Sequence, residues 1–121
     1  MAEVKRAVRV AERVHEELAA MLARDVKDPR VSGVVISRVT MTDDLRQARV
    51  FVRLLQDDDD RRTAAITALS RAAPMLRSGI TKRAQLRYAP ELKFQYDEGQ
   101  EARMRIDQLL DEVNRDLNRK Q

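Results

Sequence analysis

The sequence predicts an α+β domain in which a three-stranded sheet carries helices on one face. Apolar residues recur every three or four positions near both ends of the chain, and three segments between them alternate apolar and polar residues. A length of 121 residues suits one domain, 1–121, and is short for two. The predicted order is helix, strand, strand, a kinked pair of helices, strand and a last helix.

The composition restricts the class of protein. Hydrophobic residues make up 43% of the chain and charged residues 36%, which is too apolar for a disordered chain and too charged for a membrane protein. No run approaches the roughly 18 to 20 apolar residues of a spanning helix, and the charged start does not resemble a signal segment. There is no cysteine. We therefore expect a soluble, cytoplasmic protein without disulfides and without a membrane partner.

The first predicted helix covers residues 4–24 and carries a basic face. Lys5, Arg9 and Arg13 lie four residues apart and stack along one side, with Arg6 beside them. This face lies opposite the apolar stripe and covers only the first half of the helix. A polyanion is a natural ligand for such a row of cations.

Three segments are predicted to form strands. Residues 34–42 are rich in β-branched types but alternate imperfectly, whereas residues 47–55 alternate cleanly, so the two form an antiparallel hairpin with one buried face. Residues 91–96 form the third strand. The uncovered face of the sheet is expected to show Arg49, Arg53 and Lys93.

An acidic run, Asp57–Asp60, precedes the middle helical region. Its expected role is to cap the next helix and to place negative charge in its first turn. A metal site is the alternative, but the run lacks the alternating spacing of a calcium loop, and we predict no metal.

The middle region is predicted to contain two helices separated by a kink. A helix over residues 61–73 has an alanine-rich face, and Pro74 cannot continue it without disruption. We expect the kink at Ala72, Ala73 and Pro74 and a second helix that ends at about Gln85. The last helix, residues 100–118, has one apolar face, formed by Ile106, Leu109, Leu110, Val113 and Leu117. The sequence leaves open whether the chain is ordered beyond about Asn118.

The positive charge is concentrated in one window. Residues 61–89 contain seven basic and no acidic side chains, while the remainder of the chain is net negative. RNA or DNA would relieve the mutual repulsion of these cations. The alternative is a solvated face that is paired with acids from elsewhere in the fold. The seven residues are Arg61, Arg62, Arg71, Arg77, Lys82, Arg83 and Arg87.

Catalysis is not indicated. His15 is the single histidine, and we expect it to be an isolated surface residue. The three glycines are far apart, so there is no phosphate-binding loop and no Gly-x-Ser-x-Gly turn. We predict no enzyme, no cofactor and no small-molecule substrate. Among the four aromatic residues, Phe94 and Tyr96 are interpreted as core, and Phe51 is a possible stacking platform.

Three stretches of the chain resemble the bacterial ribosome-binding factor A family. They are the helix and turn Val14–Val31, which ends in Lys27-Asp28-Pro29-Arg30-Val31, the hairpin Val39–Val52, and the third-strand region with Leu76-Arg77-Ser78, Leu86–Phe94 and Asp97. The similarity covers about residues 4 to 113, and the order and spacing of the three stretches make it specific.

The resemblance implies a KH-like domain of the type II order α-β-β-α-α-β with an added C-terminal helix. It also implies a non-catalytic factor that binds the free small (30S) subunit and 16S ribosomal RNA near its 5′-terminal helix, assists late maturation of the precursor RNA and supports growth in the cold. The Gly-x-x-Gly loop of ordinary KH domains is absent here. The family has an Ala-x-Gly kink, and proline replaces the glycine in Ala72-Ala73-Pro74.

The leading hypothesis is thus a monomeric RNA-binding assembly factor for the small ribosomal subunit. Two alternatives remain open: a general KH-like binder of single-stranded RNA, and a protein-interaction module that uses the last helix if its apolar stripe is uncovered. The residues expected to contact RNA phosphates are Lys5, Arg6, Arg9, Arg13, Arg71, Arg77, Lys82, Arg83 and Arg87.

Overall fold

A computed structural model describes residues 2–119, with side chains for residues 5–99 and 108–117. The elements are α1 (Ala2–Arg24), a 3₁₀ turn η1 (Pro29–Val31), β1 (Val34–Met41), β2 (Gln47–Leu54), α2 (Asp59–Arg83), β3 (Glu91–Tyr96) and α3 (Gln100–Arg119). The predicted strands and terminal helices are confirmed to within about two residues at each end. The end of the chain after Arg119, and the side chain of Ile106, lie outside the described residues.

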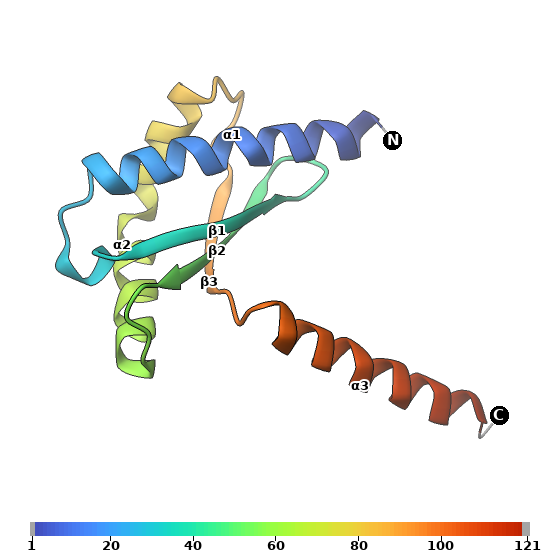
Figure 1. The fold of residues 1–121 in the computed structure, drawn as a ribbon. Helices are drawn as coiled ribbons and strands as arrows, with labels where there is room; N and C mark the ends of the chain where they lie inside the picture. The colour runs from blue at the N-terminus through green and yellow to red at the C-terminus, as the bar shows by residue number, and fades with distance from the viewer. Residues whose placement is uncertain (1, 120–121) are drawn as a thin grey trace.

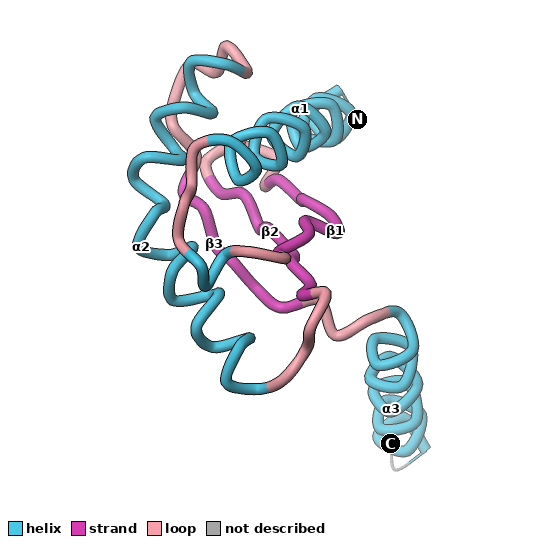
Figure 2. The backbone as a smooth tube through the Cα atoms, turned by 60° about the vertical axis from the view of Figure 1, so that its left-hand side comes forward, coloured by secondary structure: helices cyan, strands magenta, loops and turns pink. Residues whose placement is uncertain are grey.

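The three strands form one mixed sheet in the order β1-β2-β3. β1 and β2 are antiparallel, which confirms the predicted hairpin, and β3 runs parallel to β2. Parallel neighbours need a long crossover, and α2 provides it. The helices α1 and α2 cover the same face of the sheet, while α3 extends away from the other elements (Figures 1 and 2).

A β-bulge explains the imperfect alternation in β1. Ile36 is paired with Val52 and Arg38 with Phe51, so that Ser37 is an extra residue in the ladder. Without the extra residue, Ile36 and Arg38, two positions apart, would lie on the same face of the sheet. The bulge places them on opposite faces. Ile36 is buried among the core residues, while Arg38 lies on the opposite face.

The core lies between the sheet and the two covering helices. Its fully buried side chains come from α1, β2 and α2, and each leucine or isoleucine buried in this way contributes about 1.5 to 3 kcal/mol. This packing holds α1 and α2 at fixed positions over the sheet. The largest members are Leu18, Leu69, Leu76, Ile80, Val14, Val50 and Val52.

The predicted break in the middle helical region is wrong as a division into two helices. The helix α2 is continuous through Ala72-Ala73-Pro74, although it follows a bent path in Figure 2. Pro74 removes one N–H donor, and the carbonyl that loses it belongs to Ser70, one turn earlier. Both residues are exposed, so water can solvate that carbonyl. Leu69 and Leu76, fully buried on either side, keep both halves of the helix on the sheet.

The acidic run caps α2, as the sequence predicted. Asp58 is the N-cap, and its side chain accepts a hydrogen bond of 2.7 Å from the backbone N–H of Arg61. Asp59 and Asp60 lie in the first turn, where negative charge interacts favourably with the helix dipole. The run therefore belongs to the local structure of the helix start.

Candidate nucleic-acid interface

The middle and the C-terminal half of α1 lie beside the C-terminal end of α2. Arg13 donates a hydrogen bond of 3.3 Å from Nη1 to the carbonyl of Ala84, 71 residues later in the sequence. Gly79 of α2 faces Met21 of α1, and a Cβ atom at position 79 would require the flexible end of the Met21 side chain to move. Arg13, the last cation of the basic face of α1, therefore lies next to the end of α2.

The C-terminal end of α2 is closed by backbone hydrogen bonds. The N–H of Ala84 bonds to Ile80 at 2.8 Å, and the N–H of Leu86 reaches back to Thr81 at 2.9 Å. Between them, Gln85 has a left-handed backbone with φ of 55°, which is the geometry of a Schellman motif. The turn directs the chain back toward β3 and keeps the cations of the last turn at the surface.

We define the α1/α2 basic surface as the cations of the basic face of α1, of the C-terminal end of α2 and of the turn that follows α2. Five of them are exposed and form no ion pair with any described side chain: Lys5, Arg6, Arg9, Lys82 and Arg87. Arg13 and Arg83 complete the surface where the helices meet. Arg83 is 3.6 Å from the carboxylate of Asp25, and both side chains are partly exposed.

Two predicted contact residues lie apart from this surface. Arg77 donates from Nε to the carbonyl of Pro90 at 2.9 Å and from Nη2 to that of Ala89 at 3.2 Å, so it fixes the segment that enters β3. Arg71 lies near Asp28, where its positive charge helps to lower the pKa of that carboxyl. Only some of the basic residues between positions 61 and 89 therefore belong to the α1/α2 basic surface.

At the N-terminal end of α2, the basic side chains form ion pairs with nearby carboxylates. Arg61 is 3.2 Å from Asp58. Arg62 binds Asp57 at 2.5 Å and Glu98 at 3.3 Å, and its guanidinium lies 3.9 Å from the centre of the Tyr96 ring. The hydrogen bond from Arg62 lowers the pKa of Asp57 and raises that of Arg62. At this end, pairing with acids from elsewhere is the correct interpretation.

The uncovered face of the sheet shows Arg49, Arg53 and Lys93, as predicted. It also holds Arg38, which the sequence analysis missed, with its Cζ atom 4.0 Å from the centre of the Phe51 ring. Only the register of the hairpin, including the bulge, brings these two residues together. Phe94 is buried, which confirms its assignment to the core.

His15 is not the isolated surface residue that the sequence suggested. It is half-buried, and its Nε2 atom lies 3.1 Å from the carbonyl of Ile36, beside the bulge in β1. To form this hydrogen bond, Nε2 must carry the proton and donate. His15 thus supports the bulge.

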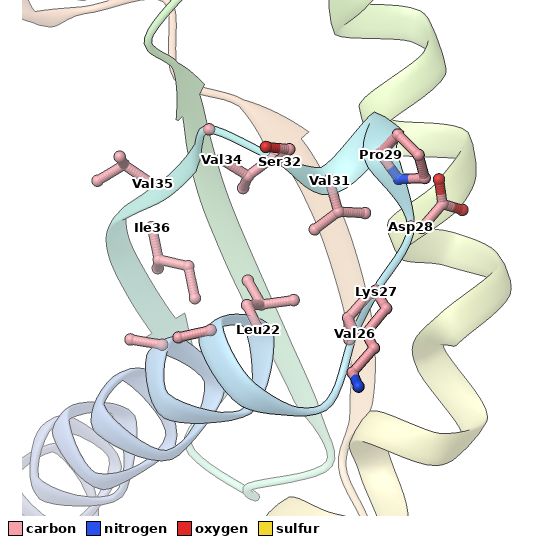
Figure 3. Close-up of a pocket in the computed structure, with 13 residues that line it drawn as sticks. Leu22, Val26, Lys27, Asp28, Pro29, Val31, Ser32, Val34, Val35 and Ile36 are labelled. Carbon is pink, nitrogen blue, oxygen red and sulfur yellow. The ribbon is translucent and has the colours of Figure 1, made fainter.

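A hollow of about 600 Å³ lies between the end of α1, η1 and the start of β1 (Figure 3). Leu22, Val31 and Ile36 line it from these three segments. Asp28 lies at its edge and is held by Arg30, which donates at 2.6 Å and lowers the pKa of the carboxyl to about 2. Lys27 and Ser32 add polar groups to this otherwise apolar lining.

The helix α3 leaves its apolar stripe exposed. Leu109, Leu110, Val113 and Leu117 are each more than half accessible to solvent. The condition that the sequence analysis set for a protein-interaction role is therefore met within residues 108–117.

Two further classes of feature, membrane spans and metal sites, concern the described part of the chain, residues 2–119. Among these residues, no helix is long and apolar enough to cross a membrane. Nor do three or more His, Cys, Asp or Glu side chains converge there as a metal site would require.

Comparisons with known proteins agree with this geometry. A family model described as ribosome-binding factor A matches residues 6–110. Proteins of that name from Sorangium cellulosum and Geobacter sulfurreducens are 46% and 41% identical to this chain, covering 91% and 89% of it and 90% and 91% of their own lengths.

One crystal structure and one fitted model share the fold. The crystal structure of ribosome-binding factor A from Thermus thermophilus matches with a TM-score of 0.66 at 23% identity, over 74% of this chain and 93% of that one. A homology model of the Thermus thermophilus factor, fitted into a cryo-EM map of a 30S complex, matches with a TM-score of 0.61 at 24% identity, over 72% and 90%. These neighbours have a KH-like fold, which confirms the predicted fold class.

Proposed function

Because this chain belongs to the ribosome-binding factor A family, we propose that it binds the free small ribosomal subunit through 16S ribosomal RNA. The relatives carry the word ribosome-binding in their name, and one structural neighbour was fitted into a map of a 30S complex. Within this chain, the α1/α2 basic surface is the part whose chemistry suits such a partner.

One observation supports this proposal above the others. Five exposed cations, four of them on the helices α1 and α2 and Arg87 in the turn after α2, form no ion pair with any described side chain, and Arg13 links α1 to the end of α2. Arginine and lysine on rigid elements suit backbone phosphates. The chain has no Gly-x-x-Gly loop, and Tyr88 is an exposed aromatic residue next to Arg87. Because its cations outnumber this aromatic ring, the surface suits the shape and backbone of structured RNA better than a run of single-stranded bases.

The finer role follows from the family. We propose that the protein acts as a non-catalytic monomer in the bacterial cytoplasm, assists late maturation of the precursor RNA and supports growth in the cold. Arg77, Ala72 and Ala73 are left out of the proposed contact, because Arg77 is bound to backbone carbonyls and the two alanines pack against the core. Arg71 is left out because it lies near Asp28, apart from the α1/α2 basic surface.

Co-sedimentation with purified free small subunits tests the proposal. If about five phosphates are neutralised, the logarithm of affinity should fall with the logarithm of salt concentration with a slope of roughly −3 to −4. Absence of binding at low salt contradicts the proposal. A short unstructured RNA that competes as well as ribosomal RNA favours the general single-stranded binder instead.

The exposed stripe of α3 supports a second candidate, a protein-interaction module. Apolar side chains that remain in water on one face of a helix are typical of a surface that a partner covers. Light scattering over a range of concentrations separates the two cases. A constant mass of 14.0 kDa supports the monomer, and a mass that rises with concentration shows that the chain associates with itself.

A further inference from the structure

The sheet face that α1 and α2 leave uncovered carries a second group of cations. The pairing register places Arg49 directly beside Lys93 on the neighbouring strand, with Thr40 on its other side. All three side chains are exposed. This face is opposite to the one that the helices cover, so it is separate from the α1/α2 basic surface.

The pairing register places the like charges of Arg49 and Lys93 side by side on adjacent strands, which is unfavourable in the isolated protein. Adjacent strands lie about 4.8 Å apart, and like charges directly opposite each other destabilise a sheet. Lys93 is relieved in part by Glu91, 3.0 Å away, but both groups are more than half exposed. Arg49 forms no ion pair with any side chain that the structure describes. An anion bound between the two cations would remove the repulsion.

The next row of the same face offers a stacking surface. Arg38, Phe51 and Gln95 are neighbours across the three strands. The guanidinium of Arg38 covers the Phe51 ring at 4.0 Å, and no hydrogen-bond acceptor holds its Nε atom among the described residues. A guanidinium plane supported by a ring can stack on an unpaired base, and Gln95 supplies an amide that can both donate and accept.

We propose that this open sheet face binds a second, single-stranded segment of RNA. Its phosphates bind Arg49 and Lys93, and a base stacks against the Arg38–Phe51 pair. The bases of a duplex are stacked on one another and are not available to the ring, so the geometry favours a single strand. The inference rests on the proposed function only in the choice of RNA as ligand, because the two surfaces lie on different faces and are tested separately.

The test compares two double variants with the same change in charge. R49Q with K93Q alters the open face, and K82Q with R87Q alters the α1/α2 basic surface. A fluorescein-labelled oligouridine of about twelve nucleotides, which spans such a site, is titrated by anisotropy at low salt. We expect the first variant to lose about tenfold in affinity for the oligonucleotide and the second less than about twofold. With purified small subunits, the second variant should show the larger loss.

A third variant and a spectrum keep the outcome unambiguous. F51L should weaken oligonucleotide binding about fivefold or more, provided that its circular dichroism shows a folded domain. Amide chemical shifts of the unmodified protein should change in β2 and β3 on addition of oligouridine. The inference is overturned if R49Q/K93Q loses no more affinity than K82Q/R87Q, if the shifts are confined to the end of α2, or if polyglutamate binds as tightly as the oligonucleotide.

The two proposals can fail independently. If the unmodified protein does not bind small subunits but binds the oligonucleotide at β2 and β3, the proposed function is wrong and the proposal for the open sheet face stands. Subunit binding without any oligonucleotide binding has the opposite meaning.

Discussion

The two ends of α2 contain the same kinds of side chain and treat them in opposite ways. At the N-terminal end, Arg61 and Arg62 are bound by carboxylates from the acidic run and from Glu98. At the C-terminal end, Lys82 and Arg87 are exposed and unpaired among the described residues. The first pair stabilises the protein, and the second pair is available to a ligand.

The difference arises from neighbours that are close in space. The chain that enters α2 is acidic and supplies Asp57 and Asp58 to the helix start, whereas the C-terminal end lies beside Arg13 and Met21 of α1. Asp25 reaches only Arg83 there. A count of basic residues in a stretch of sequence therefore indicates a binding surface only after the cations that form ion pairs in the fold have been subtracted.

The largest expected effect comes from removing two positive charges at one end of α2 or at the other. K82Q/R87Q and R61Q/R62Q each remove two positive charges. The first should weaken binding to small subunits about tenfold and make the salt slope shallower by roughly 1.4 to 1.8, because two phosphate contacts are lost. The second should leave binding within about twofold of the unmodified protein and lower the thermal midpoint, since Arg62 joins Asp57, Glu98 and the Tyr96 ring.

Co-sedimentation and thermal unfolding, measured on the same preparations, check this pair. Equal losses of affinity in both variants would show that only net charge matters, and the distinction between the two ends would then be wrong.

A smaller effect is expected at Arg77, a basic residue of the same window that serves the fold. R77M keeps the aliphatic stem and loses the hydrogen bonds to Ala89 and Pro90. Urea unfolding should show that the free energy of unfolding falls by about 1 to 2 kcal/mol, because methionine cannot donate the hydrogen bonds that the charged guanidinium makes in the folded state. Affinity for small subunits should stay within about twofold. A loss as large as that of K82Q/R87Q would restore Arg77 as a direct RNA contact.

The fold was largely predictable because its elements follow local rules. Periodicity gave α1 and the strands, and the acidic run gave the cap of α2. The bulge at Ser37 and the parallel placement of β3 were not predictable, since both depend on pairing between segments distant in sequence. The break at Pro74 was wrong because burial of Leu69 and Leu76 holds the helix together across the lost hydrogen bond.

The candidate site was predictable only as a set of residue types. The sequence identified Lys82 and Arg87 and also Arg77, but nothing local distinguishes an exposed cation from one that caps a loop. Arg38 was missed because its partner, Phe51, is thirteen residues away and meets it only through the shifted register. Side-chain partners across the fold decide such cases.

The smallest expected effect concerns acid and the N-terminal end of α2. The hydrogen bond from Arg62 holds the pKa of Asp57 below its ordinary value of 3.8. The unfolded chain therefore takes up a proton first as the pH falls, and the stability that ionised Asp57 contributes is complete above about pH 5 and is lost below pH 4. D57N should accordingly be less stable than the unmodified protein at neutral pH, and urea unfolding should show the difference shrinking near about pH 2.5. D60N is the matched control, because Asp60 belongs to the same run but forms no ion pair with a described side chain. If D57N and the unmodified protein differ equally at both pH values, or if D60N converges in the same way, the pairing that neutralises this end of α2 does not contribute in solution.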